Sequence, residues 1–70
     1  MKVMTKEKMP KYPEYTLVIE ADEEANTFVS TILKDEAGEQ VKIFESFPWS
    51  SEEQVKKEAI DYFTHLRKGN

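Results

Sequence analysis

The sequence predicts an α+β domain in which a three-stranded antiparallel β-meander is followed by one C-terminal α-helix that packs on one face of the sheet. Three runs rich in β-branched and aromatic residues come first, and short polar segments separate them. An amphipathic run with helical spacing follows the third of these runs. The predicted strands and the predicted helix would each span roughly 25 Å, so the helix matches the sheet in length.

Residues 1–13 are expected to form a basic, flexible tail in front of a single folded domain at residues 14–70. The segment has no apolar period, and Pro10 and Pro13 favour extended backbone in the residues that precede them. It carries four lysines against one glutamate, whereas residues 14–70 carry six basic and thirteen acidic side chains. The folded part is therefore expected to have a net charge of −7, although the whole chain has −4.

Three strands are expected in order along the chain. The first is Tyr15–Glu20, and the second, Thr27–Leu33, follows a polar turn in which Asn26 tolerates a left-handed conformation. The third is Gln40–Phe47, which a type I turn with Gly38 at positive φ joins to the second strand. The second and third strands should therefore form a hairpin.

The helix is expected to begin after Pro48 and Trp49. Ser50 and Glu53 have the spacing of a capping box, with Ser50 as the N-cap residue. Gly69 is expected to end the helix. Between these limits, apolar residues recur at helical spacing at Val55, Ala59, Tyr62, Phe63 and Leu66, with Ile60 beside them.

One helix covers only one face of the sheet, so the other face is expected to carry an apolar patch. In either register of the hairpin, Val18 and Phe44 lie on the face away from the helix, and two apolar residues of the second strand join them. An apolar patch that faces water often marks an interface. Three occupants fit this patch: the tail, through Met9 and Tyr12, a second copy of the chain in a homodimer, or a different protein.

The acidic residues of the two strand-connecting turns form the other candidate interaction surface. They would supply the charge if the protein mimicked a nucleic acid and occupied a basic groove on another protein. Trp49, between the sheet and the helix, either covers the edge of the core or is an exposed interface anchor. The acidic residues in question are Asp22, Glu23, Glu24, Asp35, Glu36 and Glu39.

No catalytic, cofactor or metal site is predicted. His65 lies near the end of the predicted helix, and no nucleophile with an orienting carboxylate is evident beside it, so we expect a half-exposed helix histidine. The run Asp22–Glu24 lacks the ligand spacing of an EF-hand loop. The chain has no cysteine, which excludes disulfides and thiolate metal sites. We therefore expect a protein that is not an enzyme and binds no cofactor.

The composition favours a cytoplasmic location. No apolar run approaches the roughly 20 residues that span a bilayer. Met1–Pro13 is polar and lacks the apolar core of a signal peptide. The absence of cysteine agrees with a reducing compartment, and we expect no membrane partner.

Parts of the chain resemble three known groups of proteins. The segment Tyr15–Glu20, the acidic turn after it, and the late helix with Glu52–Glu53 and Ala59–Ile60 resemble the HicB-type antitoxin domain, although the Leu-Pro-Gly segment that this family carries before its helix is missing. The order of elements is similar to that in the arm-binding domains of some integrases, which are basic where residues 14–70 are acidic. In size, acidity and strand-rich build, the chain is similar to small phage-encoded inhibitors, including anti-CRISPR proteins. These resemblances assign no functional residue.

The sequence thus favours a small, acidic, non-catalytic binding protein, regulatory or inhibitory, that contacts a protein partner through the uncovered sheet face or the acidic surface. The alternative is a nucleic-acid-binding module in which the basic tail contacts phosphates and the sheet presents aromatic side chains. That alternative predicts strongly salt-dependent binding. The acidic body repels phosphates, so the protein partner is the favoured interpretation.

Overall fold

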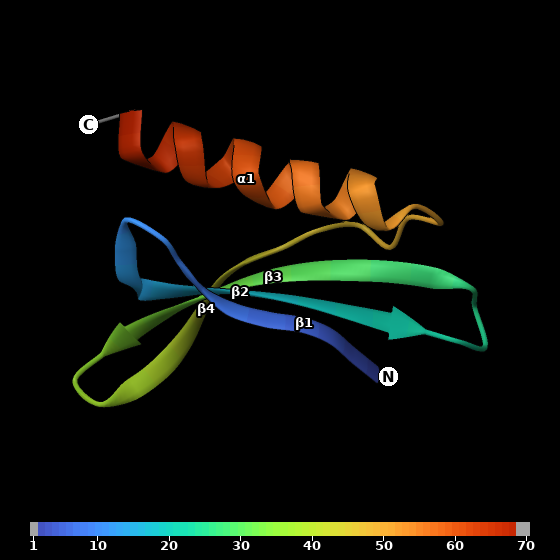
Figure 1. The fold of residues 1–70 in the computed structure, drawn as a ribbon, viewed down its shortest axis with the longest axis horizontal. Coiled ribbons are helices and arrows are strands. Elements are labelled where there is room, and N and C mark those ends of the chain that lie inside the picture. Colours follow the sequence, from blue (N-terminus) through green and yellow to red (C-terminus); the bar gives the residue numbers. More distant parts are fainter. Residues whose placement is uncertain (1, 69–70) are drawn as a thin grey trace.

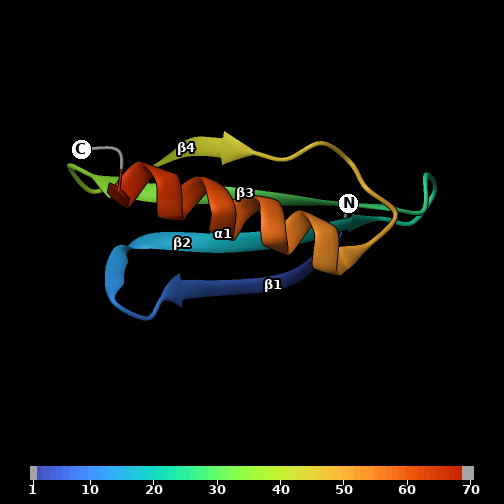
Figure 2. The same ribbon diagram turned by 90° about the horizontal axis from the view of Figure 1, so that it is seen from above.

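Four antiparallel strands and one helix make up residues 2–68, the part of the chain that the computed structural model describes (Figure 1). They are β1 (Lys2–Met9), β2 (Tyr12–Asp22), β3 (Thr27–Glu36), β4 (Glu39–Glu45) and α1 (Glu52–Lys68). The strands follow one another across the sheet in chain order, and α1 lies over β2 and β3 on one face (Figure 2). The α+β class and the late helix are as predicted, but the sheet has four strands instead of three.

β1 is formed by the segment that was expected to be a flexible tail, so that prediction is wrong. The strand pairs antiparallel with β2, from Lys2 opposite Ala21 to Met9 opposite Tyr12. Two register shifts interrupt the pairing, and the first makes Met4 an extra residue of β1, which removes the strict alternation by which a strand is recognised in a sequence. Most side chains of β1 are exposed, so the segment extends the backbone of the sheet without adding much to its core.

The β2–β3 turn uses a left-handed backbone and a side-chain acceptor. Asn26 has a φ of 57°, as the sequence predicted for this position. The carboxylate of Asp22 accepts hydrogen bonds from the backbone N–H groups of Glu24 (3.1 Å) and Ala25 (3.2 Å). Asp22 therefore shapes the turn through its own side chain.

The β3–β4 turn is a tighter turn than predicted. Glu36 pairs with Glu39, which leaves a loop of only two residues, Ala37 and Gly38. Their φ values are 52° and 84°, and positive values at both positions are typical of a type I′ hairpin turn. The positive φ of Gly38 is confirmed, but the predicted type I turn is wrong because Ala37 is also left-handed.

A β-bulge in β4 reverses the predicted placement of Phe44. Ile32 pairs with Phe44 and Leu33 pairs with Lys42, so Ile43 is an extra residue in β4. The insertion turns Phe44 to the helix side of the sheet, where its ring stacks on Tyr62 of α1. The prediction that Phe44 shares a face with Val18, away from the helix, is therefore wrong, since it assumed an unbroken alternation.

The core lies between α1 and the middle of the sheet. Ile19 and Ile32 of the sheet and Val55 of the helix are at most 1% exposed. Ala59, also fully buried, has a small side chain that lets the helix approach β3 closely. The buried cluster consists of Tyr15, Leu17, Ile19, Ile32, Val55, Ala59 and Phe63.

Two buried serines connect the helix, β3 and the segment between β4 and α1. The hydroxyl of Ser30 donates a hydrogen bond to the carbonyl oxygen of Val55 over 2.6 Å. The N–H of Ser30 donates to the hydroxyl of Ser46, and the N–H of Ser46 donates back to the carbonyl of Ser30, both over 2.9 Å. This network fixes the start of α1 and the chain that leads to it against the same point of β3.

α1 begins one residue later than the sequence indicated. The hydroxyl of Ser51 accepts a hydrogen bond from the N–H of Gln54 (3.2 Å), and the carbonyl of Ser51 accepts one from Val55 (3.3 Å). Ser51 is therefore the N-cap residue, and the assignment of Ser50 is wrong by one position. The predicted stop at Gly69 lies outside the described residues.

Candidate protein-interaction site

On the face of the sheet opposite α1, the central side chains are buried by neighbouring side chains of the sheet. Its central residues Val18 and Thr31 are only 7% and 8% exposed, although the helix lies on the other face. Lys6 lies opposite Val18 and Glu45 lies opposite Thr31, and long side chains of this kind cover neighbouring apolar surface with their stems. The predicted apolar patch is therefore not found on this face of the described sheet, and Val18 is not accessible to a partner.

A charged pair borders the same face along β4. Lys42 and Glu45 form an ion pair of 2.8 Å. The hydrogen bond from Lys42 to Glu45 and the negative charge of Glu45, with a smaller contribution from Glu20, raise the pKa of Lys42 above its ordinary value. Because both side chains are exposed, the pair contributes little stability, but it makes this border polar.

Aromatic residues gather instead on the β4 side of α1, and we call this group the aromatic edge. Phe44 stacks on Tyr62 with ring centroids 4.6 Å apart. One helical turn before Tyr62, Glu58 accepts a hydrogen bond from the indole N–H of Trp49. The aromatic edge consists of Phe44, Phe47, Trp49 and Tyr62.

Trp49 is held in place from both its backbone and its ring. Its N–H and carbonyl pair with Phe28 at the start of β3, over 3.0 Å and 2.6 Å. Its indole N–H donates to the carboxylate of Glu58 over 2.5 Å. Even so, Trp49 is 41% exposed, so a large part of a fixed aromatic ring faces water. The ring is thus fixed in place and partly exposed to water.

Phe47 is the most exposed large apolar residue of the described chain, at 76%. Its carbonyl accepts a hydrogen bond from the hydroxyl of Ser46 over 2.9 Å, and Pro48 after it restricts its backbone to extended conformations. Phe47 was predicted to lie in the third strand, but in the structure this strand already ends at Glu45. A signal for the exposed position of Phe47 was present in the sequence: a phenylalanine, a proline and a tryptophan, at residues 47–49, come shortly before the helix cap.

The six acidic residues of the two strand-connecting turns, whose relative positions the sequence left open, lie at two opposite ends of the sheet (Figure 1). The β2–β3 turn closes one end and the β3–β4 turn closes the other, with the ten residues of β3 between them. At about 3.3 Å per residue, the strand separates the two groups by roughly 30 Å. A partner that contacts both groups would have to span nearly the whole molecule, whose longest dimension is 36 Å.

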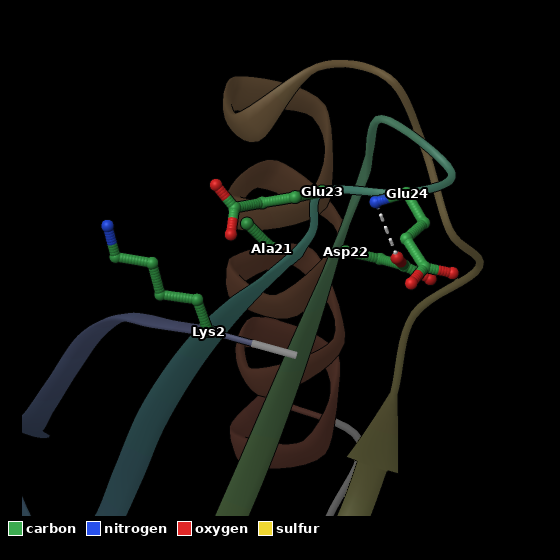
Figure 3. Close-up of a pocket in the computed structure, with 5 residues that line it drawn as sticks. All are labelled: Lys2, Ala21, Asp22, Glu23 and Glu24. Carbon is green, nitrogen blue, oxygen red and sulfur yellow. Dashed lines mark hydrogen bonds between the residues drawn. The ribbon is translucent and has the colours of Figure 1, made fainter.

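A hollow of about 430 Å³ lies between the start of β1 and the β2–β3 turn, and Lys2, Ala21, Asp22, Glu23 and Glu24 line it. Figure 3 shows Lys2 and Glu23 on one side of β2, whereas the carboxylates of Asp22 and Glu24 point to the other side. Within residues 2–68, no three histidine, cysteine or acidic side chains come together to hold a metal ion. The three acidic residues therefore lie in the same turn, but their carboxylates do not converge on a common metal-binding site.

His65 lies on the exposed side of α1 near its end. Its ring nitrogen Nδ1 lies 2.8 Å from the carbonyl oxygen of Asp61, one helical turn earlier. This contact is local to the helix, and it accords with the expected half-exposed helix histidine. Among the predicted candidate residues, the structure places Phe44 and Trp49 against α1 one helical turn apart, at Tyr62 and Glu58, whereas Val18 lies on the other face of the sheet.

No protein-family model matches this chain, and searches of curated proteins and of solved structures found no significant match. α1 is the one helix of the described residues, and it is neither long nor apolar enough to cross a membrane. The function of the chain therefore has to be inferred from its own residues.

Proposed function

We propose that this protein is a small, non-catalytic binding protein that holds a protein partner through the aromatic edge. The observation that carries the proposal is Phe47, a large apolar side chain that is 76% exposed on a backbone held by its neighbours. Trp49 provides a second exposed ring two residues further along the chain. Large aromatic side chains near the centre of an interface supply much of its binding energy.

The segment is also ordered before any partner arrives. Ser46 and Trp49 each pair with β3, on either side of Phe47, and Glu58 fixes the indole ring. Ordering a flexible loop on binding costs free energy, and a segment that is already fixed avoids most of that cost. The aromatic edge therefore has the pre-formed geometry that a specific protein interface requires.

Negative charge around the aromatic edge indicates the kind of partner. Glu52 and Glu53 follow it at the start of α1, and Glu58 contacts Trp49 directly. A partner with an apolar pocket bordered by lysines or arginines fits this pattern, and a phosphate backbone does not. This is the pattern of an acidic regulator or inhibitor that occupies a basic site on another protein.

The test compares Phe47→Ser with Ile60→Ser in capture experiments. Ile60 is a matched control because it is also an exposed apolar residue, at 43%, and lies in α1. The tagged proteins are incubated with lysate of the producing cells, with and without nuclease, and bound proteins are released along a salt gradient. Loss of a hot-spot side chain weakens binding by about 2 kcal/mol or more, or roughly thirtyfold, so Phe47→Ser should lose its partner and Ile60→Ser should keep it.

A partner that both variants retain equally would refute the role of the aromatic edge. Material that disappears on nuclease treatment would support the nucleic-acid alternative instead. Capture of only a second copy of the chain would show self-association. Once a partner is purified, the fluorescence of Trp49, the single tryptophan of the chain, should change on binding because its ring loses contact with water.

A further inference from the structure

The β1–β2 turn and the last turns of α1 lie at the same end of the molecule (Figures 1 and 2). Two adjoining hollows are lined by residues of this turn and of the end of α1. They have volumes of about 260 and 350 Å³, and both are lined by Tyr12 and Phe63. Met9 and Pro10 complete the apolar lining of the first hollow, and Thr64 contributes to the second. This region is remote from the start of α1, where Trp49 lies.

The floor of the hollows is made of closely packed aromatic rings. Phe63 is 7% exposed, and its ring packs against Tyr12 at 5.3 Å and against Tyr15 at 4.9 Å between centroids. Met9, which is partly buried, borders this floor with a flexible thioether chain that adapts to different shapes. The hollows can therefore receive an apolar side chain without rearrangement of the core.

The rim of the hollows is positively charged, although the protein as a whole is acidic. Lys11 comes from the β1–β2 turn, and Arg67 and Lys68 come from the last turn of α1. The guanidinium of Arg67 lies over the ring of Tyr12, 3.9 Å from its centroid. No carboxylate of the described residues forms an ion pair with any of these three cations, so their charges are available to an acidic group.

We propose that these hollows bind an acidic peptide segment of a partner protein that carries one apolar anchor side chain. The anchor enters the space bordered by Met9, Tyr12 and Phe63, and the flanking carboxylates pair with the cations of the rim. An arginine stacked on an aromatic ring still presents N–H groups at its edge, which suits carboxylate binding. This binding surface is independent of the aromatic edge.

The position of the hollows favours such a peptide over a small free anion. The C-terminal end of a helix carries a partial negative charge, which opposes an isolated anion and is partly offset by Arg67 and Lys68 themselves. The apolar contact with the hollows has to supply part of the binding energy. A ligand that combines an apolar anchor with carboxylates meets both conditions.

The test uses three labelled peptides, EDFDE, EDADE and QNFNQ, and follows binding by amide chemical shifts and fluorescence anisotropy. EDFDE should bind with shifts confined to residues 9–12 and 63–68. Removal of the buried anchor in EDADE should weaken binding about tenfold or more, and removal of charge in QNFNQ should weaken it and abolish its salt dependence. Equal binding of EDFDE and EDADE, shifts elsewhere, or no binding up to millimolar EDFDE would overturn the proposal.

Variants of the protein provide the second arm of the test. Arg67→Gln and Lys11→Gln should each weaken EDFDE binding by roughly two- to fivefold, the effect of one exposed ion pair. Lys57→Gln, the same change at an exposed lysine of α1 outside the hollows, should leave binding unchanged. Phe47→Ser should also leave it unchanged, which separates this proposal from the function of the aromatic edge. An equal loss in Lys57→Gln would show that only net charge matters and would overturn the proposal.

Discussion

Replacement of Ala37 should make the protein more stable. Ala37 is the first residue of the two-residue β3–β4 turn and has a φ of 52°, in the left-handed region. The left-handed conformation costs an L-residue with a Cβ about 1–2 kcal/mol. Asparagine is tolerated in this conformation and is preferred before glycine in this type of turn. Ala37→Asn should therefore raise the free energy of unfolding by roughly 0.5–1 kcal/mol.

That gain is large for so small a domain. A single core of this size rarely supplies more than about 3–5 kcal/mol, and 1 kcal/mol shifts the melting temperature by about 4–8 °C. Thermal unfolding followed by far-UV circular dichroism should thus show an increase of about 2–8 °C for Ala37→Asn. Ala25→Asn is the matched control in the other turn, where the backbone is not left-handed, and it should show no such increase.

The neighbouring glycine gives the opposite result. A Cβ added to Gly38 would meet no atom within 4 Å, but the φ of 84° is unfavourable for any side chain. Gly38→Ala should therefore lower the free energy of unfolding by about 1 kcal/mol for conformational reasons alone. If Ala37→Asn lowered the melting temperature, or raised it no more than Ala25→Asn, the assignment of a type I′ turn would be refuted.

Three further changes test other parts of the fold. Ser30→Ala should cost about 1 kcal/mol in urea unfolding because it removes one buried hydrogen bond, and Ser30→Val should cost more because it displaces α1 from β3; equal costs would contradict the close packing. Asn26→Ala should cost about 1 kcal/mol and Asn26→Gly little, and a neutral alanine variant would argue against the left-handed turn. Deletion of residues 1–9 should lower the melting temperature and increase aggregation, measured by light scattering, because it exposes the edge of β2; an unchanged protein would indicate a dispensable tail.

The parts of the fold that could be read from the sequence are those with a strong local period. The apolar spacing from Val55 to Phe63 predicts the helix and its buried side, because a helix shows its core-facing residues every three to four positions. The alternation in β2 likewise predicts that Tyr15, Leu17 and Ile19 share the buried face. These residues make most of the core.

The errors arise where the backbone departs from a regular period. The extra Ile43 in β4 moves Phe44 to the other face, and a single inserted residue leaves no mark in the composition. The pairing of β1 depends on main-chain hydrogen bonds to β2, which the exposed side chains of Lys2–Met9 do not encode. The burial of Val18 follows from the pairing of β1, because Lys6 of β1 lies opposite Val18 on one side and Thr31 of β3 lies opposite it on the other.

Only part of the candidate site could be predicted from the sequence, for the same reason. Trp49 was predicted either to cover the edge of the core or to be an exposed anchor, and in the structure it is 41% exposed and is not among the side chains that pack on the buried cluster. Phe47 was assigned to a strand, since an apolar residue after Phe44 fits an alternating pattern. The hollows beside Phe63 are lined by residues 9–12 and by residues within 63–68. Sequence spacing gives no information about contacts between segments so far apart in the chain.

The order of the strands also determines when the core becomes protected during synthesis. Each strand pairs with its neighbour in the chain, so the whole sheet can form from short-range contacts before α1 has left the ribosome. The contacts of the helix are more distant, as between Ser30 and Val55, which are 25 residues apart. Until α1 packs on the sheet, the apolar face of Leu17, Ile19 and Ile32 is open to other chains. Because α1 is what covers this face, truncation within the helix should yield a protein that aggregates.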